Sequence, residues 1–185
     1  MRRNIRNWLN AAAPALRHRG PVLEVGSLWV HGGGGPELAD LRPLFPGEEF
    51  VGCDMREGPG VDVVANAEWL PDSWAGRFGL LLCLDTIEHV RNAWQACREF
   101  RRVLRPGGLC IVVTVFNYAE HDHPHDYWRP TPQGMLVWLN SFETRLAMAE
   151  GKGSPESCIG LGLAGAGEFP SCLTDPWPYR VESEA

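Results

Sequence analysis

The sequence predicts a single α/β domain built around a mainly parallel β-sheet. Short apolar runs alternate along the chain with amphipathic stretches, an order typical of strand–helix–strand units. The run 79–84 is apolar throughout, as expected for a strand that is covered on both faces of a sheet. Glycine and proline clusters such as 105–108 separate these stretches. A chain of 185 residues is long enough for one such domain with a real core.

Five apolar runs are expected to form the parallel strands. Each run is short and is bounded by turn residues, the pattern of a buried strand. Cys53, Cys83 and Cys110 lie inside three of these runs, where cysteine behaves as a small buried hydrophobe. The five expected strands are 21–25, 50–53, 61–64, 79–84 and 109–115.

Three stretches are expected to form helices. Apolar residues in 93–104 recur at helical spacing, and the sequence "RPGG" at 105–108 ends that pattern. Thr131 and Pro132 form an N-cap followed by proline at the first helical position, so a helix is expected to run to 139. The segment 36–45 is also expected to be helical, with Pro36 in its first turn.

The two ends of the chain are expected to differ from the central domain, which is assigned to 20–166. Residues 1–19 contain five arginines and no acid, and form a basic arm or helix that is either solvated or a contact for an anionic partner. The runs 142–149 and 158–164, separated by a Gly/Ser/Pro turn, read as a terminal hairpin. The tail 167–185 is proline-rich and is expected to be irregular.

Composition and charge exclude several classes of protein. The formal net charge of −6 argues against a nucleic-acid-binding protein. There is no run of 18 apolar residues that could cross a membrane, and no apolar segment of a secretory signal after the first arginines. The six cysteines form no C-x-x-C pair. A cytoplasmic protein with reduced cysteines is therefore expected.

The stretch "VLEVGSLWVHGGGG" at 22–35 suggests a ligand-binding turn after the first strand. A phosphate-binding P-loop is excluded, because it needs a lysine and the only lysine is Lys152. A dinucleotide-binding turn is disfavoured, because the second and third glycines expected after Gly26 are missing. S-adenosylmethionine has no phosphate and needs one close backbone approach and a carboxylate for its ribose. Asp54 could supply that carboxylate, or could simply cap a turn.

Five segments, taken in order, resemble the class I S-adenosylmethionine-dependent methyltransferases. The similarity is closest to a branch whose first motif reads glycine-serine and which carries a Pro-x-Asp-Tyr-Trp-Arg element, here within "HPHDYWRPTP" at 123–132. The segments are "VLEVGS" (22–27), "FVGCDM" (50–55), "VDVVANAEWLP" (61–71), "LLLCLDTIEHV" (80–90) and "RVLRPGG" (102–108).

The resemblance implies a Rossmann-like sheet of seven strands in the order 3-2-1-4-5-7-6, with helices on both faces. It also implies S-adenosylmethionine as the cofactor. Leu28 and Val30 depart from the family pattern of the first loop, and the glycines at 32–35 either take over part of that loop or form a flexible connection. The implied cofactor-binding residues are Glu24, Gly26 and Ser27 near the methionine portion, Asp54 and Met55 near the ribose, Asn66 and Ala67 near the adenine, and Leu84 and Asp85 along the cofactor's edge.

The segment 116–131 is a long connection rich in aromatic and titratable side chains, and is expected to close one side of the acceptor pocket. Three interpretations of its "HDHPHDYW" stretch remain open. His121, His123 and His125 could share a metal ion, although the resembled branch has no general metal requirement. His121 or His123 could be a general base. The stretch could instead be structural, with Asp126 paired to an arginine. The candidate catalytic residues are therefore His121, His123 and Asp126, with no metal.

The sequence favours an S-adenosylmethionine-dependent methyltransferase that modifies an oxygen or nitrogen atom of a small molecule. Nucleic acid and membrane partners are disfavoured by the acidic charge and by the absence of a long apolar run. An inactive binding or regulatory protein that keeps the methyltransferase fold is the alternative, supported by the unusual first loop. A nicotinamide dehydrogenase is a distant third.

Overall fold

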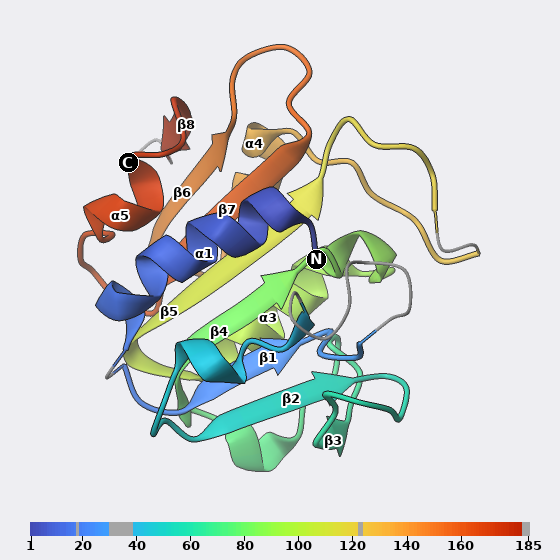
Figure 1. Cartoon of the computed structure of the whole chain (residues 1–185), viewed down its shortest axis with the longest axis vertical. Coiled ribbons are helices and arrows are strands. Elements are labelled where there is room, and N and C mark those ends of the chain that lie inside the picture. The colour runs from blue at the N-terminus through green and yellow to red at the C-terminus, as the bar shows by residue number, and fades with distance from the viewer. Residues whose placement is uncertain (18, 30–38, 122–123, 183–185) are drawn as a thin grey trace.

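The computed structural model describes residues 1–17, 19–29, 39–121 and 124–182 of the chain. Its centre is a sheet with the strand order β3-β2-β1-β4-β5-β7-β6-β8 (Figure 1). The strands are β1 (Val22–Val25), β2 (Phe50–Asp54), β3 (Val63–Val64), β4 (Phe78–Leu84), β5 (Leu104–Val115), β6 (Thr144–Ala149), β7 (Ser157–Leu163) and β8 (Tyr179–Glu182).

The pairing of the strands confirms the predicted topology. The first five strands are parallel, and β7 lies antiparallel between β5 and β6. Val25 is in register with both Cys53 and Cys83, so that β1, β2 and β4 end at the same edge of the sheet. That edge is where ligands bind in open α/β sheets, at the point where the strand order reverses.

Helices cover both faces of the sheet (Figure 1). Side chains alternate along β4, so Leu81 and Cys83 belong to one core cluster while Leu80 and Leu82 belong to the other. The helices α3 (Ala93–Val103) and α4 (Pro132–Trp138) pack on the first cluster, and α1 (Arg3–Leu16) and α5 (Ser171–Thr174) on the second. Short 3-10 turns complete the fold: η1 (Arg42–Leu44), η2 (Asp72–Trp74) and η3 (Ile87–His89).

The observed bounds of α3 and α4 agree closely with the helices predicted from apolar spacing, capping residues and the Gly/Pro cluster. The helix α3 ends at Val103, immediately before the Gly/Pro cluster, and Gly107 has a φ of +77° that suits glycine. The helix α4 begins after Thr131, whose hydroxyl oxygen accepts a hydrogen bond from the backbone N–H of Gly134 at 3.1 Å. The terminal hairpin is likewise confirmed as β6 and β7.

The prediction of an irregular tail was wrong. The tail forms α5 and then β8, which adds an antiparallel strand beside β6. Leu173 and Trp177 of the tail are buried, and the ring of Trp177 lies 5.4 Å from that of Trp8 on α1. The tail is ordered because it buries these two apolar side chains against α1, which a proline-rich composition does not reveal.

The basic N-terminal segment is a packed helix and not a solvated arm. Ile5, Trp8 and Leu9 are buried on the face of α1 that contacts the sheet. Residues 36–38 of the helix expected over 36–45 lie outside the described residues. In the described part, 39–45, the prediction was wrong, because after Ala39 the chain forms only the turn η1. Pro43 lies inside that turn and has no N–H to continue a helix. No helix in the described part of the chain is long and apolar enough to span a bilayer.

Candidate active site

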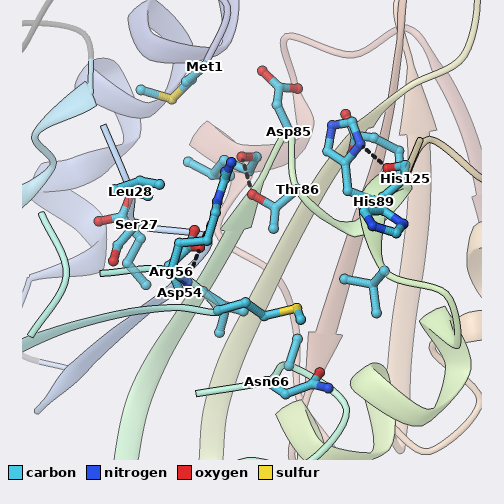
Figure 2. A pocket seen from close by; sticks show the side chains of 18 of the residues that line it. Met1, Ser27, Leu28, Asp54, Arg56, Asn66, Asp85, Thr86, His89 and His125 are labelled. Atoms are coloured by element: carbon cyan, nitrogen blue, oxygen red, sulfur yellow. Dashed lines mark hydrogen bonds and ion pairs between the residues drawn. The ribbon is translucent and has the colours of Figure 1, made fainter. Parts of the chain in front are cut away.

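A cavity of about 1040 Å³ lies at the carboxyl ends of β1, β2 and β4. Figure 2 shows Ser27, Leu28 and Asp54 on one side of it and His89 and His125 on the other, with Asp85 and Thr86 between them. The cavity thus combines the turns that follow three neighbouring strands with the loop that follows β5. All nine expected cofactor-binding residues line it: Glu24, Gly26, Ser27, Asp54, Met55, Asn66, Ala67, Leu84 and Asp85.

The loop that follows β1 and begins with Gly26 and Ser27 is packed closely against the end of β4. Gly26 has a φ of +84°, and a Cβ built on it would lie 2.1 Å from the hydroxyl oxygen of Thr86. The backbone N–H groups of Gly26 and Ser27 both donate to the carbonyl of Cys53, at 2.8 and 3.1 Å. A side chain at position 26 would therefore clash with Thr86. The role of the glycines at 32–35 lies outside the described residues.

Glu24 is a buried acid on β1 in the wall of this cavity. Its side chain has one oxygen, Oε2, without a hydrogen-bond partner among the described residues. Burial raises the pKa of the Glu24 carboxyl to about 8. At neutral pH the group is therefore largely protonated until a cation approaches it.

Asp54 both caps its own turn and faces the cavity. Its Oδ1 accepts a hydrogen bond from the backbone N–H of Arg56 at 3.0 Å, and its side chain is 13% exposed. Met55 lines the cavity beside it and is 67% exposed. After the neighbouring strand β3, the amide oxygen of Asn66 accepts a hydrogen bond from the backbone N–H of Glu68 at 2.9 Å, which fixes the turn that carries Ala67.

Asp85 lines the cavity, but its carboxylate is bound by Arg2 from the start of α1. The guanidinium of Arg2 lies 2.7 Å from Asp85 Oδ1, and the backbone N–H of Arg2 donates to Oδ2 at 3.0 Å. Sequence reasoning missed Arg2, because 83 residues separate the partners and no local pattern joins them.

His121 and Asp126 come together in the loop that follows β5. The two oxygens of Asp126 accept hydrogen bonds from Arg129 at 2.7 and 2.6 Å, and these bonds hold the pKa of the carboxyl below its usual range. Asp126 Oδ2 also lies 3.2 Å from Nδ1 of His121 and accepts the backbone N–H of that residue at 2.8 Å. Asp126 is therefore paired with Arg129 and also orients His121. His123 lies outside the described residues.

Glu88 and His89, in the turn η3, lie beside His121. Glu88 is fully buried, and burial raises the pKa of its carboxyl. The rings of His89 and His121 are 4.8 Å apart between centroids. Among the described residues, His125 is not part of this group, and its Nδ1 lies 2.8 Å from the hydroxyl of Tyr127. The buried acid Glu88 was not expected from the sequence.

The family model described as "Methyltransferase domain" matches residues 32–112. The ubiquinone biosynthesis O-methyltransferase of Pseudomonas aeruginosa (strain LESB58) is 27% identical over 123 residues. That match covers 59% of this chain and 49% of the relative. The chain thus spans about half the length of the curated relatives it matches.

Solved structures share the fold at low sequence identity. A SAM-dependent methyltransferase of Thermotoga maritima is 19% identical with a TM-score of 0.60, and the match covers 85% of this chain and 89% of that chain. The 1,6-didemethyltoxoflavin-N1-methyltransferase of Burkholderia thailandensis, solved with its namesake substrate and S-adenosylhomocysteine, is 16% identical with a TM-score of 0.61. This second match covers 86% of this chain and 76% of that chain.

The chain is thus similar to methyltransferase domains in its sheet order and over residues 32–112 of its sequence. The family match begins after β1, so the glycine-serine motif of the first loop is outside it.

Proposed function

We propose that the protein is an S-adenosylmethionine-dependent methyltransferase that modifies an oxygen or nitrogen atom of a small molecule. The observation that carries this proposal is the single cavity that brings Gly26, Asp54 and Asn66 together at the ends of three strands. We also propose that the chain belongs to the branch with the glycine-serine first motif, because Ser27 is buried beside Gly26 and the late element holds the paired Asp126 and Arg129.

The proposed cofactor occupies the side of the cavity nearest β1 and β2. Asp54 accepts the ribose hydroxyls, and each such charged hydrogen bond contributes roughly 1.5–3 kcal/mol. Asn66 and Ala67 lie near the adenine. Glu24, Gly26 and Ser27 lie near the methionine portion, with Met55, Leu84 and Asp85 along the remaining edge of the cofactor.

The proposed acceptor lies on the side formed by the loop 116–131. Methyl transfer is an in-line displacement, so positioning carries much of its rate. An acceptor must also lose a proton, and general bases speed such steps by about 10²–10⁴-fold. His121 is the candidate that acts on the acceptor, and Asp126 is its positioning partner through the 3.2 Å contact with Nδ1. His123 is a second candidate from the sequence.

A small molecule fits the size and the charge of the site. Ligand cavities of about 300–1000 Å³ hold drug-sized molecules, so this cavity has room for the cofactor and a modest acceptor. The net charge of −6 does not favour nucleic acid. We place the protein in the cytoplasm, because all six cysteines are free and five of them are buried.

A second candidate function is an inactive binding protein with the same fold. The observation in its favour is the first loop, where Leu28 lines the cavity at a place where the family pattern has glycine. Calorimetry with S-adenosylhomocysteine tests the cofactor site, and transfer of a labelled methyl group to a panel of hydroxyl- and amine-bearing small molecules tests the activity. Micromolar binding with transfer supports the enzyme, binding with no transfer supports the second candidate, and no binding at millimolar ligand contradicts both.

A further inference from the structure

Three potential metal ligands converge at the acceptor side of the cavity. One ligand atom from each of Glu88, His89 and His121 lies within 4.8 Å of the other two. Glu88 and His89 belong to the turn η3, which follows β4, whereas His121 comes from the loop that follows β5. The neighbouring parallel strands β4 and β5 thus bring these residues together from separate parts of the sequence.

Both histidines are held so that Nε2 keeps its lone pair. Nδ1 of His89 lies 2.6 Å from the backbone carbonyl of His125, and a carbonyl can only accept, so Nδ1 carries the proton. Nδ1 of His121 lies 3.2 Å from Asp126 Oδ2 and 3.2 Å from the carbonyl of Ala119, which are also acceptors. A third contact of His121 Nδ1, with Arg129, is longer at 3.5 Å.

This arrangement is that of metal-binding histidines, whose second nitrogen usually donates to a carboxylate or a backbone carbonyl. Asp126 can serve as the carboxylate for His121, because its two hydrogen bonds from Arg129 keep it ionised. The carbonyl of His125 serves in the same way for His89.

Glu88 adds an unsatisfied oxygen at the same place. Its side chain is fully buried, and its Oε2 accepts a hydrogen bond from the hydroxyl of Thr114 at 2.8 Å. Its Oε1 has no hydrogen-bond partner in the described part of the chain. A buried polar oxygen without a partner is costly, and a cation would compensate it.

We propose that Glu88, His89 and His121 bind a divalent transition-metal ion, with zinc as the best match. Two imidazole nitrogens and one carboxylate oxygen form a typical zinc ligand set with a fourth position left open. Zinc–ligand bonds of about 2.0–2.1 Å place tetrahedral ligand atoms about 3.3 Å apart. The three ligand atoms therefore need to approach one another by about 1.5 Å or less, which small rotations of the partly exposed histidine rings can provide.

The role of this ion rests on the proposed function and specifies the acceptor as a hydroxyl compound. An acceptor oxygen at the open position loses its proton to water more easily, because the cation stabilises the oxyanion. The oxygen then attacks the methyl carbon of the cofactor. A C–O bond forms, the C–S bond breaks, and its electron pair stays on sulfur. His121 then acts on the acceptor by holding the metal.

Zinc binding to the whole, metal-free protein tests the site without any acceptor. Calorimetry should detect about one bound zinc ion per chain, and His89→Ala or His121→Ala should weaken binding at least about tenfold. Glu168→Gln is the control, since Glu168 is exposed and does not line the cavity, and this variant should bind zinc as the wild type does. Absence of zinc binding, or an equal loss in the control variant, overturns the proposal.

The same proteins separate this proposal from the proposed function. S-adenosylhomocysteine should bind the wild type and the two histidine variants with affinities within about threefold, because the ligands lie on the acceptor side. Cofactor binding without zinc binding overturns the metal site alone. Zinc binding without cofactor binding overturns the methyltransferase assignment and leaves the metal site in place. Glu88→Gln should also lose zinc binding. If this variant of a buried residue does not fold, the variants of the two partly exposed histidines still decide the test.

Discussion

The guanidinium of Arg2 lies 2.7 Å from the carboxylate of Asp85 and joins the start of α1 to the end of β4. Both side chains are largely buried, and Arg2 also donates to the hydroxyl oxygen of Ser157 at 2.8 Å. Asp85 has a φ of +48°, a backbone conformation that is uncommon for an aspartate and that the surrounding contacts must maintain. The N-terminal helix is therefore part of the wall of the candidate cofactor cavity.

Arg2→Met should destabilise the protein by on the order of 3 kcal/mol, because it leaves a mostly buried carboxylate without its cation. Chemical denaturation measures this loss. Arg3→Met is the matched control, since Arg3 is exposed one residue further along and should change the free energy of unfolding by less than about 0.5 kcal/mol. Equal small effects of the two substitutions would show that the Arg2–Asp85 pair contributes no net stability.

Asp54→Ala should weaken binding of S-adenosylhomocysteine at least about tenfold, because the ribose hydroxyls lose a charged hydrogen-bond acceptor. Calorimetry gives the affinity, and a thermal unfolding curve checks that the variant remains folded. Glu57→Ala removes a nearby exposed acid that does not line the cavity, and should leave the affinity unchanged. If the affinity of the Asp54 variant is also unchanged, Asp54 only caps its turn.

Glu24 should make stability depend on pH. Its folded pKa of about 8 lies above the unfolded value of about 4.3, so the fold favours the protonated form. This contribution is fully present below about pH 4 and is lost as the pH rises toward about 8. Between about pH 5 and 8 the free energy of unfolding of the wild type should therefore fall by several kcal/mol relative to that of Glu24→Gln. Glu168→Gln, at an exposed site, should follow the wild type, and parallel curves for all three proteins would rule out the raised pKa.

Cofactor binding should release the proton of Glu24. The ammonium of a cofactor placed beside Glu24 stabilises the carboxylate, so the affinity for S-adenosylhomocysteine should rise from about pH 6 to pH 8 and then level off. Calorimetry in buffers of different ionisation enthalpy counts the released protons. The side chain in Glu24→Gln has no proton to lose, so S-adenosylhomocysteine should release fewer protons on binding this variant than on binding the wild type. A wild type that releases no more protons than this variant would place the methionine portion away from Glu24.

The C-terminal tail should be required for full stability. Trp177→Ala removes a buried ring that packs edge to face on Trp8, and should lower the free energy of unfolding by about 3 kcal/mol or more. Trp69→Ala is the control, because that side chain is 68% exposed and its removal should have little effect. A loss at Trp177 no larger than at Trp69 would mean that the tail is dispensable for folding.

The sequence predicts those parts of the fold that depend on local patterns. The continuous apolar run of β4 and the helical spacing of α3 can each be recognised within a short stretch of sequence. The position of Asp54 at the end of β2 likewise makes it a candidate for the ribose hydroxyls. The tail escaped prediction because its order depends on Trp177 meeting Trp8, far away in the sequence.

The acceptor side of the site also depends on contacts between distant segments. Glu88 accepts a hydrogen bond from the hydroxyl of Thr114 on β5, and His89 is oriented by a carbonyl 36 residues away. No local periodicity indicates either contact. The pairing of Asp126 with Arg129 was foreseeable, because the two residues are three positions apart within one short element.

The last prediction concerns His121, which should serve the acceptor and not the cofactor. His121→Ala should lower turnover by about 10²-fold or more while the affinity for S-adenosylhomocysteine stays within about threefold, because the imidazole serves the acceptor side of the cavity. Asp126→Asn should also lower turnover, since a neutral amide at this position would hold His121 less firmly; kcat should fall more than KM changes. His123→Ala tests the second histidine candidate in the same assay, with any hydroxyl or amine compound that the wild type methylates. A parallel loss of cofactor affinity in the His121 variant would assign the loop to cofactor binding or to the fold. Full turnover in both histidine variants would leave positioning of the acceptor as the source of the rate.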